Sequence, residues 1–186
     1  MNSSPARFWY YWRSIFKPDE IKKINKLITK NLFKDNDTPA HGVTKTSEVK
    51  MVRWEKIKSL LLPMYTQALS ANELAFGFNL YPIVDSYTLN YNIYSATSKG
   101  EYDWHEDGIS FRSAVSDFKL TNLLNLSEAP YKGGSFYLGT KYCQVPELSV
   151  PGNMITFPSF RNHRVTPVTK GTRKTLALWL SGARFI

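Results

Sequence analysis

The sequence has little cysteine and little histidine. Its 186 residues contain one cysteine, Cys143, so no disulfide can form within the chain, and a disulfide-stapled secreted scaffold is excluded. A single cysteine also removes most zinc sites that are built from several thiolates. The three histidines are His41, His105 and His163, so a metal site with imidazole ligands must draw on this short set. A reducing compartment suits such a chain, and we expect a cytoplasmic protein.

Long apolar runs and flexible linkers are also absent. No window approaches the roughly 18 consecutive apolar residues that a transmembrane helix needs, so we expect no membrane partner. Hydrophobic residues make up 42% of the chain, which argues against a disordered protein. No stretch rich in proline, glycine and serine divides the sequence, and we expect one domain over residues 1–186.

Acidic residues are outnumbered by basic ones, and the formal net charge is +9. Several lysines, such as Lys22, Lys26 and Lys30, have the spacing of the solvated face of a helix. A solvated surface is therefore the favoured interpretation, and binding to a nucleic acid or an acidic partner stays open.

Residues 1–75 are expected to be mainly helical. Pro18 followed by Asp19 and Glu20 is a good helix start, because proline suits the first turn and acids suit the positive end of the helix dipole. Apolar residues follow at helical spacing. A second helix is predicted from about Arg53 to Asn72, kinked or split at Pro63.

Residues 76–186 change to short β-type runs separated by turn residues. Such a pattern predicts a sandwich or barrel. The fold class we predict is α+β, a double-stranded β-helix (jelly-roll) core with the N-terminal helices packed outside it. The predicted strands cover approximately residues 86–94, 102–106, 119–126, 135–138, 154–157, 163–168 and 174–180.

The most informative segment is a His-x-Asp pair. In an extended strand His105 and Asp107 project to the same side and offer one nitrogen and one oxygen ligand. Alone, such a pair is weak evidence for a metal site, and two surface side chains would be the favoured interpretation. A further histidine, His163, opens a later predicted strand. Two imidazoles and one carboxylate can bind one side of an Fe(II) ion and leave the other side open.

An arginine follows the last histidine across a predicted turn. Arg173 could clamp a carboxylate with its bidentate guanidinium, provided that it shares a face with His163. A two-residue turn would place these side chains on opposite faces, whereas a three-residue loop over 170–172 would place them on the same face. We predict the odd-length loop or a bulge. Without the histidines, a solvated hairpin charge would be the default interpretation.

Taken together, these blocks resemble the 2-oxoglutarate- and Fe(II)-dependent dioxygenases, in particular the prolyl 4-hydroxylase-like or PKHD-type branch, over nearly the whole chain. The residues that carry the resemblance are the helix start at 15–21, Tyr94 with the block 99–107, the Gly-Gly turn at 131–136, the segment 157–168, and 171–173.

The resemblance implies a role for six residues. His105, Asp107 and His163 would bind Fe(II) and so carry the catalysis. Arg173 would bind the distal carboxylate of 2-oxoglutarate, with help from Tyr94 and Asn92. The alternative for Asn92 is a polar strand residue that faces solvent or a neighbour.

Other residues receive weaker assignments. We expect Trp104 and Trp179 to pack in the core, with lining of a substrate cavity as the second interpretation. His41 lies in a predicted loop and is given no role.

The implied function is hydroxylation of an unactivated C–H bond by Fe(II), 2-oxoglutarate and O2, with release of succinate and CO2. The resemblance favours a prolyl residue of a protein or peptide as the target, and ascorbate is expected as a supporting factor. Two alternatives stay open. One is the same chemistry on a nucleic acid or small molecule, and the other is a non-catalytic β-barrel binding module.

Overall fold

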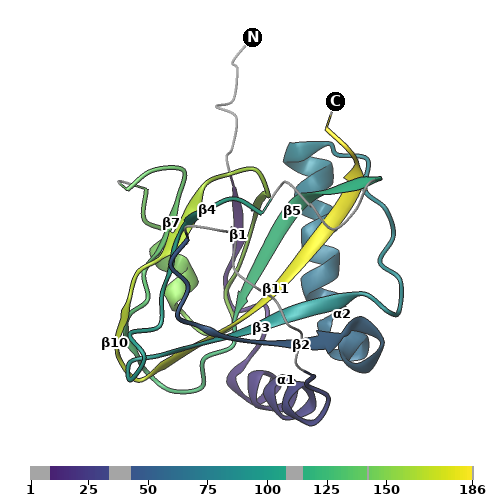
Figure 1. The fold of residues 1–186 in the computed structure, drawn as a ribbon. Helices are drawn as coiled ribbons and strands as arrows, with labels where there is room; N and C mark the ends of the chain where they lie inside the picture. The colour runs from purple at the N-terminus through teal and green to yellow at the C-terminus, as the bar shows by residue number, and fades with distance from the viewer. Residues whose placement is uncertain (1–8, 34–42, 108–114, 142, 186) are drawn as a thin grey trace.

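Two facing groups of antiparallel strands form the centre of the molecule. The computed structural model describes residues 9–33, 43–107, 115–141 and 143–185. The larger sheet has the strand order β1-β8-β5-β11-β3-β2, and smaller sheets β4-β9-β7 and β10-β6 lie opposite. Figure 1 shows both helices on one side of the larger sheet and β4, β7 and β10 on the other.

The strand bounds agree with most of the predicted strands, but four strands were not predicted as such, namely β1, β2, β6 and β10, of which β10 shares only Val168 with the predicted strand 163–168. The strands are β1 (Tyr10–Trp12), β2 (Glu48–Arg53), β3 (Thr88–Ser95), β4 (Tyr102–His105), β5 (Ser116–Asn125), β6 (Lys132–Gly133), β7 (Phe136–Leu138), β8 (Met154–Pro158), β9 (His163–Val165), β10 (Val168–Lys170) and β11 (Thr172–Ala183).

The expectation that residues 1–75 are mainly helical is therefore only partly correct. Strand β1 pairs with β8, and β2 pairs with β3. Both strands take their hydrogen bonds from segments far away in the sequence. Local patterns carry little information about such pairing, which explains why the sequence indicated neither strand.

Helix α1 (Pro18–Lys30) begins at the residue that the sequence predicted. The backbone N–H of Lys17 donates to Glu20 Oε2 at 2.7 Å and so satisfies a group at the helix start. Three isoleucines on one stripe, Ile21, Ile24 and Ile28, are buried against the larger sheet. The amphipathic pattern of the sequence thus becomes the packing face of the helix.

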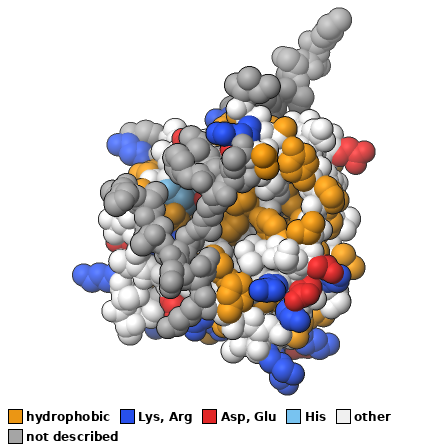
Figure 2. Space-filling view, turned by 45° about the vertical axis from the view of Figure 1, so that its right-hand side comes forward, with side chains coloured by type: hydrophobic (Ala, Val, Ile, Leu, Met, Phe, Trp, Pro, Cys, Tyr) orange, Lys and Arg blue, Asp and Glu red, His pale blue; other side chains and the backbone are white. Residues whose placement is uncertain are grey.

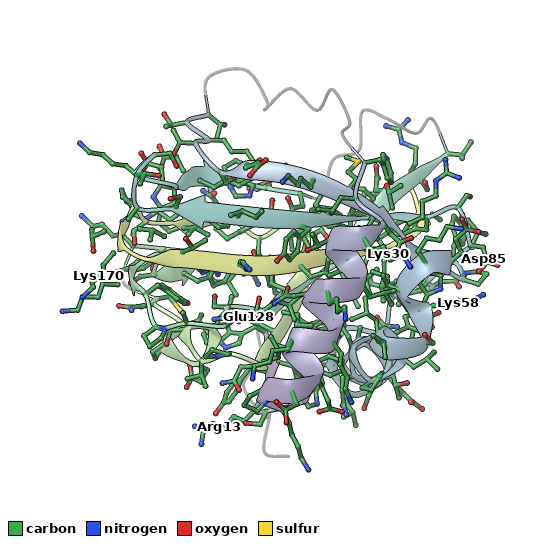
Figure 3. The ribbon with its side chains drawn as sticks, turned by 90° about the horizontal axis from the view of Figure 1, so that it is seen from below. Arg13, Lys30, Lys58, Asp85, Glu128 and Lys170 are labelled. Atoms are coloured by element: carbon green, nitrogen blue, oxygen red, sulfur yellow. The ribbon has the colours of Figure 1, made fainter. Side chains whose placement is uncertain are left out.

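A buried polar network holds α1 in place. Asn25 Nδ2 donates to the Leu126 carbonyl oxygen at 2.9 Å and to Glu128 Oε1 at 2.8 Å. Tyr91 completes the network by donating its hydroxyl to Asn25 Oδ1 at 2.9 Å. Figure 3 shows α1 lying across the sheet with Glu128 beside it. Each polar atom of the Asn25 amide is therefore paired although the side chain is buried.

Helix α2 (Trp54–Ala71) runs through Pro63 without a break, so the predicted split is wrong, and the alternative of a kink stays a prediction. Pro63 and Ser59 lie on the exposed side of the helix, where water can bond the carbonyl that proline leaves without a donor. A π-helical turn, η1 (Asn72–Phe76), continues α2, and a short 3-10 helix, η2 (Pro146–Ser149), precedes β8. No described helix combines the length and the apolar composition that a membrane span requires.

Two apolar clusters separate the layers. The larger cluster lies between the helices and the larger sheet and includes Leu176, Leu178 and Leu180 of β11. The smaller cluster lies between the sheets and includes Tyr94, Phe136 and Phe157. Because side chains alternate along a strand, Arg173, Thr175, Ala177 and Trp179 face the space between the sheets. That space holds the candidate site.

The packing of α2 generates a stability prediction. Leu61→Ala should lower the free energy of unfolding by about 2–5 kcal/mol, because the fully buried side chain leaves a cavity. Leu62→Ala, at an adjacent position that is 53% exposed, should change it by less than about 0.5 kcal/mol. Urea unfolding followed by circular dichroism measures both. Equal losses would contradict the orientation of α2.

Candidate metal centre

Two histidines on neighbouring strands face each other. His105 ends β4 and His163 begins β9, and the two residues are direct partners in the antiparallel register. The imidazole centroids are 4.1 Å apart. Asp107 follows β4, and its backbone N–H donates to the Ser159 carbonyl oxygen at 2.9 Å, which draws the turn after β4 toward the end of β8. Backbone pairing thus brings the three predicted ligands together.

The side chains of this triad (His105, Asp107 and His163) converge on one point. Asp107 Oδ1 lies 3.8 Å from His105 Nε2, and Asp107 Oδ2 lies 3.4 Å from His163 Nε2. One ligand atom from each residue lies within 4.8 Å of the others. These separations allow one ion to contact all three residues. A small area of histidine, drawn pale blue, is visible on the face that Figure 2 shows, and the three side chains are 4–13% exposed, so the triad is almost buried.

Backbone carbonyls hold both imidazole rings. His105 Nδ1 lies 2.6 Å from the Asp103 carbonyl oxygen, and His163 Nδ1 lies 2.9 Å from the Arg161 carbonyl oxygen. A carbonyl only accepts hydrogen bonds, so Nδ1 carries the proton in each neutral ring and Nε2 keeps its lone pair. The Nε2 atoms are the ones that face Asp107. This orientation is the one that a metal ligand needs.

The electrostatics of the triad favour a cation. Burial, followed by the neighbouring His163, lowers the pKa of His105 to about 3, so the His105 ring is neutral at neutral pH. Burial alone would raise the pKa of Asp107, but His163 and His105 outweigh it and hold that pKa below its ordinary value. A charged carboxylate beside a neutral imidazole is a donor pair suited to a divalent metal such as Fe(II).

The neighbours of the triad were not predicted from the sequence. The Thr121 hydroxyl of β5 donates to Asp107 Oδ2 at 2.9 Å and lies 3.0 Å from Ser159 Oγ. Tyr102 stacks on His105 with centroids 3.4 Å apart, and Phe157 packs against His163 at 4.9 Å. A threonine or tyrosine within a strand is common, so only the folded arrangement identifies these contacts.

Arg173 is buried at the far end of the same space. Its side chain is 1% exposed, and its Nε and Nη2 atoms have no hydrogen-bond partner among the described residues. The guanidinium carbon lies 5.2 Å from the centre of the Tyr94 ring. A Cβ atom at Gly134 would lie 2.9 Å from Arg173 Cδ, so glycine leaves room for the arginine at that position. A buried guanidinium with free N–H groups suits a bound carboxylate.

The predicted hairpin between His163 and Arg173 does not form. Gly171, with φ +73°, alone separates β10 from β11. Strand β10 pairs with β6, whereas β11 pairs with β3 and β5. His163 nevertheless contacts the cluster between the sheets, and Arg173 packs on Tyr94 of that cluster. Both side chains therefore share one interior, although local turn geometry is not the reason.

Tyr94 and Asn92 lie on β3 directly beside Arg173. The register pairs Tyr94 with Arg173 and Asn92 with Thr175, and both side chains are buried. Burial raises the pKa of Tyr94 although Arg173 and Ser47 oppose it, so its hydroxyl stays protonated and can donate. Asn92 Nδ2 makes one long contact of 3.4 Å, to the Asn90 carbonyl oxygen. Asn92 therefore does not face solvent, but its contact with Asn90 agrees with the alternative of a polar residue that faces a neighbour, and its role toward 2-oxoglutarate stays a prediction.

The two tryptophans do not share a role. Trp104 lies outside the core, where the Arg164 guanidinium carbon sits 5.2 Å from its ring centre. Trp179 stacks on Phe118, lies close enough to Asp107 to lower its pKa, and buries an indole N–H that has no partner among the described residues. Core packing is thus wrong for Trp104, whereas Trp179 packs on Phe118 beside the triad, and its lining of a substrate cavity stays a prediction. His41 lies outside the described residues.

Known proteins share parts of this sequence. A PKHD-type hydroxylase of Synechococcus sp. strain CC9605 is 33% identical over 105 residues, which cover 53% of this chain and 47% of that protein. The chain thus matches about half the length of that relative. A PKHD-type hydroxylase of Thermosynechococcus vestitus is 28% identical over 177 residues, which cover 89% of this chain and 75% of that protein.

Solved structures share the fold. A viral collagen prolyl hydroxylase from Paramecium bursaria Chlorella virus 1, in complex with 2OG, has a TM-score of 0.71 at 15% identity and covers 98% of this chain and 100% of its own. A prolyl hydroxylase from Trichoplax adhaerens, in complex with a peptide of hypoxia inducible factor, has a TM-score of 0.67 at 16% identity. The match covers 93% of this chain and 83% of that chain. The predicted jelly-roll core with helices outside it is confirmed.

The family assignment rests on the strands that carry the site. Residues 89–181, half of the chain, match the model of the 2OG-Fe(II) oxygenase superfamily, and this span contains the triad and Arg173. The resemblance to prolyl 4-hydroxylase-like and PKHD-type enzymes is thereby confirmed. The chain belongs to the 2OG-Fe(II) oxygenase superfamily.

Proposed function

We propose that this protein is a 2-oxoglutarate- and Fe(II)-dependent dioxygenase that hydroxylates a prolyl residue of a protein or peptide and releases succinate and CO2. The observation that carries the proposal is the buried Arg173 guanidinium, whose free N–H groups lie in the same interior as the triad. A non-catalytic binding module would have no use for a buried cation beside three metal-ligand side chains, because burying an unpaired charge is costly.

The residues present fit both cofactors. The triad offers two nitrogen donors and one charged oxygen donor, which suit Fe(II). Arg173 supplies unpaired N–H groups for one carboxylate of 2-oxoglutarate. When bound, Fe(II) and 2-oxoglutarate supply the activation of O2, with one oxygen atom entering the C–H bond and the other entering succinate as CO2 leaves.

The protein's part in this reaction is positioning and shielding. Under the proposal, His105, Asp107 and His163 hold Fe(II), and the Asp103 and Arg161 carbonyls keep Nε2 of each ring directed at it. The Thr121 hydroxyl restrains the Asp107 carboxylate. Apolar packing around His163 limits the access of water to the centre.

The cosubstrate pocket lies at the other end of this interior. Arg173 binds the distal carboxylate, and the protonated Tyr94 hydroxyl is available as a second donor. Asn92 contributes a polar edge on the same face of β3. Ascorbate as a supporting factor, a single domain over residues 1–186 and a cytoplasmic location stay predictions.

The substrate class is supported by structural relatives. Two similar structures are named prolyl hydroxylases, and one of them holds a peptide. Apolar side chains gather on the same face as the visible imidazole in Figure 2, which suits a prolyl side chain better than a phosphate backbone. The net charge of +9 keeps a nucleic acid as the second candidate.

Removal of one ligand should strongly weaken metal binding. Asp107→Ala should weaken the binding of Mn(II), used as a stable substitute for Fe(II), by more than about 100-fold, since losses of that size already follow from changes to groups that only support a ligand. Isothermal titration calorimetry measures the affinity. Glu106→Ala is the matched control, because this adjacent carboxylate is exposed. If Asp107→Ala binds Mn(II) like the wild type, Asp107 is not a ligand.

Cosubstrate turnover is tested without knowledge of the substrate. Anaerobic protein with Fe(II) and 2-oxoglutarate should show a weak visible charge-transfer band, and succinate should form when O2 is admitted. Arg173→Ala should raise the 2-oxoglutarate concentration needed by about 10- to 100-fold, because a charge-assisted hydrogen bond is lost. Lys170→Ala, an exposed cation nearby, should not. If the wild-type protein shows neither the band nor succinate, the proposed enzymatic activity is wrong.

The substrate class is tested by mass spectrometry. Proline-containing peptides and single-stranded oligonucleotides are offered separately with Fe(II), 2-oxoglutarate and O2. We expect addition of one oxygen atom to a prolyl residue and no change in peptides in which alanine replaces proline. Oxidation of the oligonucleotides alone would replace the prolyl proposal with the nucleic-acid alternative.

A further inference from the structure

The segment 43–49 closes the side of the site between the two sheets. The Asp103 backbone N–H donates to the Thr44 carbonyl oxygen at 2.9 Å, and Thr46 N–H donates to the Glu101 carbonyl oxygen at 3.1 Å, so the segment first pairs with the chain around β4. It then continues as β2, where Val49 pairs with Asn92 of β3. Figure 1 shows this dark blue stretch running from beside β4 to β2.

Alternate residues of this segment face the interior. Residues 43, 45, 47 and 49 are partly buried, whereas 44, 46 and 48 are exposed. Lys45 is bridged to Tyr102, the residue that stacks on His105. Ser47 lies two residues further along and acts on the Tyr94 hydroxyl. The segment therefore carries one side chain toward the triad and another toward Arg173.

Ser47 carries a buried hydroxyl next to Tyr94. Its Oγ atom is buried and has no hydrogen-bond partner among the described residues. Ser47 directly precedes Glu48, which pairs with Ile93, and the next residue of β3, Tyr94, pairs with Arg173, so the three polar groups lie at the same level of neighbouring strands. All three groups can donate hydrogen bonds, and the Nε and Nη2 atoms of Arg173 have no acceptor among the described residues. Such a cluster of donors is completed by an anion.

Lys45 places a second cation near the metal end. Its ammonium lies 4.4 Å from the centre of the Tyr102 ring. Asp107 attracts it electrostatically, and it in turn disfavours protonation of His105. The described residues offer Lys45 no hydrogen bond or ion pair. Burial lowers the pKa of Lys45, and a bound anion would offset that cost of desolvation.

The spacing of the two side chains fits a short dicarboxylate. Lys45 and Ser47 precede β2, with a bend at Ser47, so their Cα atoms are at most about 7 Å apart. The two carboxylate carbons of an extended five-carbon diacid are about 5 Å apart, from ordinary bond lengths. A hydrogen bond at each end bridges the difference. The single segment 43–49 can therefore contact both ends of such a molecule.

We propose that Ser47 and Lys45 bind the two carboxylates of 2-oxoglutarate, Ser47 the distal one together with Arg173, and Lys45 the one beside the metal. The proposal rests on the proposed function and deepens it. Segment 43–49 thereby becomes a third wall of the cosubstrate pocket, in addition to β3 and β11. It also makes the pocket selective for a diacid over a monoacid.

The test measures binding to Mn(II)-loaded protein without O2, by calorimetry. Lys45→Met should weaken the binding of 2-oxoglutarate by about 10- to 100-fold, because a charged donor is lost. Ser47→Ala should weaken it by about 3- to 10-fold, because a neutral donor is lost. Lys50→Met is the matched control, because it removes a lysine just beyond segment 43–49, where Lys50 forms an ion pair with Glu48. It should bind 2-oxoglutarate like the wild type.

Two monoacids assign each residue to one carboxylate. In 2-oxopentanoate the distal carboxylate is replaced by a methyl group, and in 4-oxopentanoate the carboxylate beside the ketone is replaced. Lys45→Met should weaken the binding of 2-oxopentanoate and leave the binding of 4-oxopentanoate unchanged. Ser47→Ala should weaken the binding of 4-oxopentanoate and leave the binding of 2-oxopentanoate unchanged. Equal weakening of both monoacids by one variant would overturn its assignment, because it would indicate a general distortion of the pocket.

The failure of this inference is distinguishable from failure of the proposed function. If the wild type itself does not bind 2-oxoglutarate, the proposed function fails. If the wild type binds it and Lys45→Met binds it equally well, only the role of Lys45 is overturned. Thermal unfolding of each variant confirms that the fold is retained.

Discussion

The alternation of side chains along strand β11 is the constraint on which the site depends. One face of the strand carries Leu176, Leu178 and Leu180 into the core beneath the helices. The opposite face carries Arg173 and Trp179 into the space between the sheets. Buried donors without partners cost free energy, on the order of 1–3 kcal/mol each. The apolar face and the two helices supply the stability that allows these donors to remain unpaired.

The same alternation ties neighbouring strands to the site. Strand β3 presents Tyr94 beside Arg173, and β5 presents Thr121 beside Asp107. Because hydrogen bonds between strands fix the register, none of these side chains can move to the other face without a shift of the whole strand. The site is therefore built on rigid elements, and its polar groups are positioned before any ligand arrives.

Much of the fold could be predicted from local patterns. The stripe of α1 and the β-type runs from 86 onward were found because apolar periodicity and turn residues are local signals. Strands β1 and β2 were missed because their partners lie far away in the chain. The hairpin before Arg173 was wrong for a related reason, since β10 takes β6 as its partner.

The sequence by itself determined which chemistry the site can carry. His105, Asp107, His163 and Arg173 belong to spaced motifs, and their residue types restrict the metal and the anion. Only the tertiary structure decided which other side chains share the interior, such as Lys45, Ser47 and Trp179. These residues belong to no motif, and they meet the site because strand pairing between distant segments sets which face of each strand turns inward.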